Sequence, residues 1–130
     1  MDVRVWMNFD PGKVDLSYLL QRFRELGYGV DAEAVPAGHA EAVLEKARKA
    51  DVVIAAMEEW NEKMLSAVAG KVRLIQKYGT GLDTIDLEAA GRHGIAVANI
   101  PGANAAAVAE VALLHILNVG RKFVPCVCGV

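Results

Sequence analysis

The chain has 130 residues, of which 54% are hydrophobic and 23% charged, which suits one domain with an apolar core and a charged surface. The formal net charge is −2 and there is no basic block, so neither nucleic acid nor an anionic membrane is expected as a partner. The longest apolar stretch, 105–119, contains Glu110 and is short for a membrane span, while Asp2 and Arg4 do not suit a signal peptide, so we expect a cytoplasmic protein.

Short apolar runs alternate with amphipathic helical patterns along the whole chain. The runs predict strands at 3–7, 28–35, 52–54, 72–75 and 95–98. The helical patterns predict helices from Leu16 to a stop at Gly27, and then at 40–47, 61–70, 86–93 and 104–122. Five strand–helix pairs predict an α/β fold, an open parallel sheet of about five strands with helices on both faces.

The last of these helices is apolar around almost its whole circumference. Such a helix is normally buried on all sides, either at the centre of a compact domain or between two domains. We favour the second reading, because the sequence stops shortly after the helix. The apolar surface of this helix, which a second domain would normally cover, is then exposed, so we expect the chain to self-associate. This surface is contributed by Val108, Val111, Ala112, Ile116 and Val119.

The segment 74–86 carries the most chemical information. A predicted buried strand runs into Gly79 and Gly81 and then into a helix start, and ligands of open α/β sheets bind at such strand ends. Glycines allow backbone N–H groups to face an anion without an intervening side chain. The spacing alone fits a tight strand–helix turn equally well.

The same loop nearly matches the dinucleotide fingerprint G-x-G-x-x-G, but it fails in three respects. The third glycine is replaced by Thr84, and the match follows the fourth predicted strand instead of the first. The next strand ends in Ala98 and Asn99, without an acidic residue to bind a ribose. We therefore expect no nicotinamide cofactor at this loop.

Several motifs in order resemble the D-isomer-specific 2-hydroxyacid dehydrogenases. They are YGTGLDTIDLEAA at 78–90, GIAVANIPGAN at 94–104, VAE at 108–110 and Arg121. The resemblance is dense from Leu74 to Lys122, and before Val72 only the strand–helix rhythm agrees. It implies a flavodoxin-like substrate-binding domain, a separate Rossmann domain for NAD(H) or NADP(H), and an active site between the two.

The resemblance also implies which residues bind a small 2-hydroxy or 2-keto acid. The substrate-binding residues would be Tyr78, Gly79, Thr80, Gly81 and Asn104, with the substrate carboxylate on the backbone of Thr80 and Gly81. Thr80 departs from the family, where an apolar residue is common. The family's catalytic arginine, acidic residue and histidine and its cofactor loop lie later in the chain. No catalytic, cofactor-binding or metal-binding residue is therefore assigned here.

The expected organisation is a substrate-binding domain at 1–122 and a tail at 123–130, without the cofactor domain. Cys126 and Cys128 in the tail are weak evidence for a metal. The resemblance implies a truncated dehydrogenase that is inactive by itself. The alternative is a stand-alone small-carboxylate binding or regulatory module. A phospho-receiver domain is disfavoured, because Ala55 and Ala56 stand where its aspartate is required.

Overall fold

The computed structural model describes residues 3–36, 38–123 and 127. It divides into two units, Met1–Ile100 and Pro101–Val130, each described here by itself. Most of the predicted tail, including Cys126 and Cys128, lies outside the described residues.

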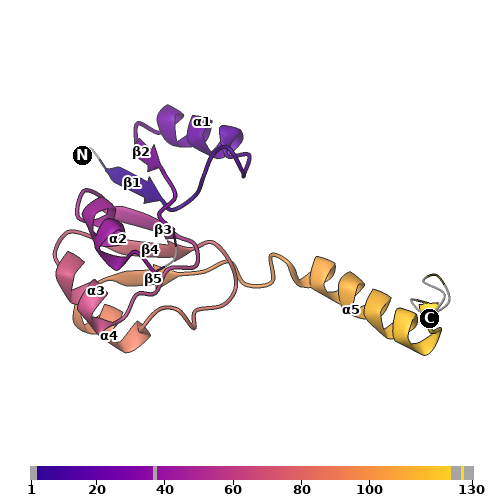
Figure 1. Cartoon of the computed structure of the whole chain (residues 1–130). Helices are drawn as coiled ribbons and strands as arrows, with labels where there is room; N and C mark the ends of the chain where they lie inside the picture. Colours follow the sequence, from indigo (N-terminus) through magenta and orange to yellow (C-terminus); the bar gives the residue numbers. More distant parts are fainter. Residues whose placement is uncertain (1–2, 37, 124–126, 128–130) are drawn as a thin grey trace. The chain divides into compact units, whose positions relative to one another are not determined.

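The first unit alternates strands and helices (Figure 1). The strands are β1 (Arg4–Met7), β2 (Gly29–Ala32), β3 (Val52–Ala55), β4 (Leu74–Lys77) and β5 (Ala96–Ala98). The helices are α1 (Ser17–Glu25), α2 (Ala40–Ala47), α3 (Glu62–Val68) and α4 (Leu87–Arg92). Each predicted strand and helix of this unit is present.

The five strands form one sheet in the order β2-β1-β3-β4-β5, and every neighbouring pair is parallel. One row of partners, Met7, Ile54, Gln76 and Ala98, crosses the sheet from β1 to β5. The predicted parallel sheet is thus confirmed, and the strand order places β4 between β3 and β5.

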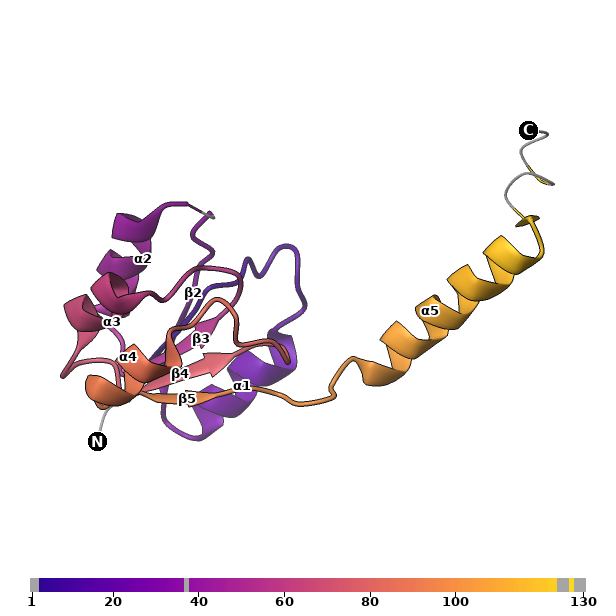
Figure 2. The ribbon, with the colours of Figure 1, turned by 90° about the horizontal axis from the view of Figure 1, so that it is seen from below.

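Helices cover both faces of the sheet, as predicted, because successive strand residues point to opposite sides. Val5, Met7 and Ile54 pack with Leu16 and α1 on one face. On the other face, Trp6 and Ile75 belong to the larger core formed with α2, α3 and α4. Figures 1 and 2 show α1 on the opposite side of the sheet from these three helices. Full burial of each such large side chain contributes about 1.5–3 kcal/mol to stability.

Two short helices begin at side chains that cap them. Asn61 Oδ1 accepts a hydrogen bond from Met64 N at 3.1 Å, as its predicted capping role requires. Asp86 Oδ1 accepts one from Ala89 N at 2.9 Å at the start of α4. These caps fix the points where the chain leaves the loops after β3 and β4.

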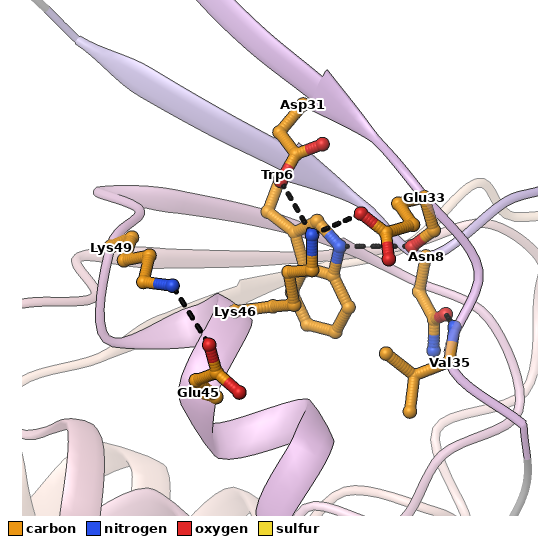
Figure 3. Close-up of polar contacts among 8 residues, drawn as sticks. All are labelled: Trp6, Asn8, Asp31, Glu33, Val35, Glu45, Lys46 and Lys49. Carbon is orange, nitrogen blue, oxygen red and sulfur yellow. Dashed lines mark hydrogen bonds and ion pairs between the residues drawn. The ribbon is translucent and has the colours of Figure 1, made fainter.

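The second strand is shorter than predicted, ending at Ala32 instead of Val35. Its partner β1 ends at Met7, so the following residues have little strand left to pair with. Side chains hold this segment instead, as Figure 3 shows. Val35 N donates to Asn8 Oδ1 at 2.7 Å, and the Trp6 indole donates to the carbonyl of Glu33 at 3.1 Å.

Lys46 of α2 holds the same edge of the sheet by bonding the side chains of Asp31, at 3.2 Å, and Glu33 (Figure 3). The hydrogen bond to Glu33 is the main reason that the pKa of Lys46 is raised above its ordinary value.

The fourth strand begins at Leu74, two residues later than predicted. Val72 N bonds Val68 O at 3.0 Å, so Val72 belongs to the turn that closes α3. It is nevertheless buried, which explains why its apolar side chain resembled part of the strand.

The second unit contains the long final helix, α5 (Ala105–Gly120), of 16 residues. Asn104 is its N-cap residue, so the predicted start is confirmed and the predicted end at Lys122 is two residues too late. Within its own unit, α5 buries none of its residues. Among the described residues, no helix is both long and apolar enough to cross a membrane.

Candidate functional site

The loop 78–82 leaves the sheet at the carboxyl end of β4, between the ends of β3 and β5. Tyr78 N donates to Ala55 O at 2.9 Å, which continues the pairing with β3 by one residue. The half-exposed ring of Tyr78 packs edge-on against Phe9, with 4.8 Å between the ring centroids. The loop therefore occupies the kind of strand end where open α/β sheets bind ligands.

The two glycines of the loop meet different requirements. Gly79 has φ +152°, a conformation that side-chain-bearing residues rarely adopt, although space beside its Cα is open. Gly81 has no such φ, but a Cβ there would lie 2.8 Å from Oδ1 of Asp83. The backbone path thus requires the first glycine, whereas a side chain at the second would require only that the exposed Asp83 carboxylate move aside.

Three hydrogen bonds attach the loop to the residues that follow β5. Ile100 N donates to Gly79 O at 2.9 Å, and Asn99 Nδ2 donates to Thr80 O at 2.7 Å. Thr80 Oγ1 donates to Ile100 O at 3.2 Å. The hydroxyl by which Thr80 departs from the family pattern is therefore engaged in holding the loop to the neighbouring segment.

A buried lysine lies at the base of the loop. Lys77 is 6% exposed, and its Nζ donates to Ala56 O and, at 3.2 Å, to Thr84 Oγ1. These two hydrogen bonds connect the residue that follows β3 with Thr84, two residues beyond the loop. Sequence reasoning assigned Lys77 no role, because a charged residue at the end of a strand is ordinarily exposed.

A buried carboxylate fixes the neighbouring strand ends. Glu58 is 8% exposed, and its Oε2 accepts hydrogen bonds from Asn8 Nδ2 at 2.7 Å and Ala56 N at 3.0 Å. Its Oε1 is buried and has no partner among the described residues. Glu58 borders a cavity of about 480 Å³ between α2 and α3. It was also missed, since two successive glutamates in a loop resemble a solvated surface.

Four of the five predicted site residues, Tyr78, Gly79, Thr80 and Gly81, lie together in this loop. The fifth, Asn104, belongs to the second unit, which is described by itself.

The histidine after α4 has a structural role. His93 Nε2 lies 2.8 Å from Glu62 Oε1, and Arg92 bonds the other oxygen of the same carboxylate. The hydrogen bond with His93, followed by that of Arg92, lowers the pKa of Glu62 below its ordinary value. This cluster joins the start of α3 to the end of α4. Among the described residues, no group of three His, Cys, Asp or Glu side chains is arranged to hold a metal ion.

Comparison with known proteins identifies the family. The model of the D-isomer specific 2-hydroxyacid dehydrogenase catalytic domain matches residues 11–119. Glyoxylate reductase of Thermococcus litoralis is 34% identical over 106 residues, covering 82% of this chain and 31% of that protein. The chain thus spans about a third of the length of this curated relative.

Solved structures agree with that match. NAD⁺-bound 3-phosphoglycerate dehydrogenase of Entamoeba histolytica has a TM-score of 0.75 and 27% identity, covering 91% of this chain and 39% of that one. The TT0316 protein of Thermus thermophilus has a TM-score of 0.79 and 29% identity, covering 97% and 39%. The chain belongs to the D-isomer specific 2-hydroxyacid dehydrogenases, within their catalytic domain.

Proposed function

We propose that this chain is the substrate-binding part of an NAD(P)-dependent dehydrogenase that interconverts a small 2-hydroxy acid and its 2-keto acid. The loop of Tyr78, Gly79, Thr80 and Gly81 holds the substrate carboxylate on the backbone N–H groups of Thr80 and Gly81. The observation that carries this proposal is the loop's position at the carboxyl end of β4, in a conformation that requires glycine at Gly79. Asn104, at the N-cap of α5, is the fifth residue that we propose for substrate binding, on the resemblance of its sequence motif.

Glyoxylate is the first substrate to test, since the curated relative with 34% identity is a glyoxylate reductase. Two charge-assisted hydrogen bonds to its carboxylate contribute about 1.5–3 kcal/mol each. Association costs about 4 kcal/mol or more. The surplus is about 2 kcal/mol at most, so we expect the 130-residue chain to bind glyoxylate with a dissociation constant weaker than about 1 mM, of the order of tens of millimolar.

Buried Lys77 favours an anion at this loop. Its ammonium bonds the carbonyl of Ala56 and the hydroxyl of Thr84, and no ion pair with a carboxylate is found for it among the described residues. A buried charge of this kind is screened less than a surface charge, so its positive potential extends to the loop that it supports.

Hydride transfer is assigned to the whole dehydrogenase and not to these 130 residues. The sequence contains no complete dinucleotide fingerprint, and the relative from Entamoeba histolytica, of which this chain covers 39%, has NAD⁺ bound. Hydride transfer also requires an acid–base group and a bound nicotinamide. We therefore expect the chain to bind the acid without turning it over.

The decisive experiment is a glyoxylate titration followed by amide NMR. Chemical-shift changes centred on residues 79–82 and on Asn104 are expected, together with no NADH consumption by the purified chain. An absence of shifts at tens of millimolar glyoxylate would leave the loop as a turn and refute the proposal. Tight carboxylate binding would instead favour a stand-alone binding or regulatory module, because no second domain would be needed.

A second element of the proposal is self-association through α5. Within its own unit, the helix leaves Val108, Val111, Ile116 and Val119 each more than half exposed. Apolar patches of a few hundred Å² on a soluble protein usually mark interfaces. Two copies of the chain would cover these residues with one another.

A further inference from the structure

The residues that follow β5 hold two successive carbonyl groups of the loop. Ile100 N bonds the carbonyl of Gly79 at 2.9 Å, and the side-chain amide of Asn99 bonds the carbonyl of Thr80 at 2.7 Å. The first bond comes from the backbone and is independent of side-chain identity. The second depends entirely on the residue at position 99.

Each carbonyl shares a peptide unit with an N–H group that the proposed function uses. Gly79 C=O shares its unit with Thr80 N–H, and Thr80 C=O shares its unit with Gly81 N–H. The two groups of a planar trans peptide point in opposite directions, and the described backbone contains no cis peptide bond. A carbonyl held toward the exit of β5 therefore turns the corresponding N–H away from it.

From this geometry we propose that Asn99 is a positioning residue for the substrate carboxylate, an inference that rests on the proposed function. Its amide fixes the peptide between Thr80 and Gly81, so that Gly81 N–H faces the carboxylate before the ligand arrives. Asn99 does not touch the substrate. It acts by removing the need for the loop to reorient on binding, which is the basis of preorganisation.

The chemistry at position 99 requires a donor. The Asn99 side chain offers an N–H₂ group, and Thr80 O is an acceptor. An aspartate of almost the same shape presents acceptor oxygens alone when ionised and repels that carbonyl. Asn99→Asp therefore reverses the polarity of the contact with little change in side-chain size, whereas Asn99→Ala removes the contact.

The test measures glyoxylate affinity of the full 130-residue chain by amide NMR. Asn99→Ala is expected to weaken binding about tenfold, equivalent to about 1.4 kcal/mol, and Asn99→Asp by at least as much. The control is Asn61→Ala, which removes another side-chain bond to the backbone, that from Met64 N. This control is expected to lower stability and to leave the affinity unchanged.

A second measurement separates this inference from the proposed function. Residual dipolar couplings report the direction of the Gly81 N–H bond without any ligand, and Asn99→Ala is expected to change that direction while Asn61→Ala does not. Altered couplings without glyoxylate binding by the wild type would refute the proposed function and retain the orienting role. Unaltered couplings, or wild-type affinity in Asn99→Ala, would overturn the inference about Asn99.

Discussion

Replacing Gly79 by alanine separates the backbone requirement of the loop from any steric one. The glycine has φ +152°, and an added Cβ would meet no atom within 4 Å. The entire cost is therefore torsional, and a residue held in such a sparsely populated region costs about 1–3 kcal/mol. Relaxation to a negative φ would rotate the adjoining peptides and break the bond from Ile100 N to Gly79 O.

Gly81→Ala is the matched comparison. Its Cβ would lie 2.8 Å from Oδ1 of Asp83, which looks like the more severe collision. Asp83 is exposed, however, and its carboxylate can rotate away. Changes of this kind at a surface usually alter stability by less than about 0.5 kcal/mol. Gly79→Ala, whose Cβ meets no atom, is thus expected to cost more stability than Gly81→Ala, whose Cβ is crowded.

Urea unfolding of the wild type and both variants measures the difference. With a slope of about 1.5 kcal/mol per M, a cost of about 1.5 kcal/mol lowers the midpoint by about 1 M for Gly79→Ala. Gly81→Ala should remain within about 0.3 M of the wild type. Equal midpoints for Gly79→Ala and the wild type, with glyoxylate shifts retained, would refute the reasoning about the loop backbone.

Three further predictions concern charge and association. The hydrogen bond from Lys71, followed by that from the backbone N–H of Arg4, holds the pKa of Asp51 below its ordinary value of 3.8. The Asp51 carboxylate therefore contributes stability that is lost as the pH falls through its folded pKa. Asp51→Asn should therefore cost about 1 kcal/mol at about pH 7. Thermal melts should show that this difference shrinks as the pH falls below 3.8 and through the folded pKa. Asp83→Asn removes a negative charge beside Gly81. For an assumed charge separation of ~6 Å in water, losing this repulsion should tighten glyoxylate binding roughly threefold, and unchanged NMR affinity would contradict it. Light scattering should show self-association at high concentration that Val111→Glu reduces, and a monomeric wild type would show that α5 forms no interface between copies.

The sequence predicted the elements well because local patterns determine them. The capping role of Asn61 and the start of the final helix at Asn104 follow from residues adjacent in the chain. The strand ends were less accurate, since they depend on partners distant in sequence. The second strand stops where β1 stops, and Val72 is buried without being part of a strand.

The sequence also located the candidate loop, because its glycines and the dense family motifs are contiguous. It did not indicate how the loop is held. In the sequence, Lys77 resembles an exposed charge and Glu58 resembles a solvated loop residue. Asn99 was noted only because it is not an acidic residue that could bind a ribose. Each acquires its role from a contact with another strand end.

The sequence by itself thus determined the family, the parallel α/β architecture and the identity of the loop that follows β4, since motif order and hydrophobic periodicity are properties of the linear chain. The tertiary structure decided the strand order, and with it the placement of β4 directly beside β5. That adjacency brings Asn99 against Thr80, 19 residues away, and fixes the direction of the loop's peptides. Hydrogen-bond direction depends on which strands are neighbours, and only the folded sheet specifies that.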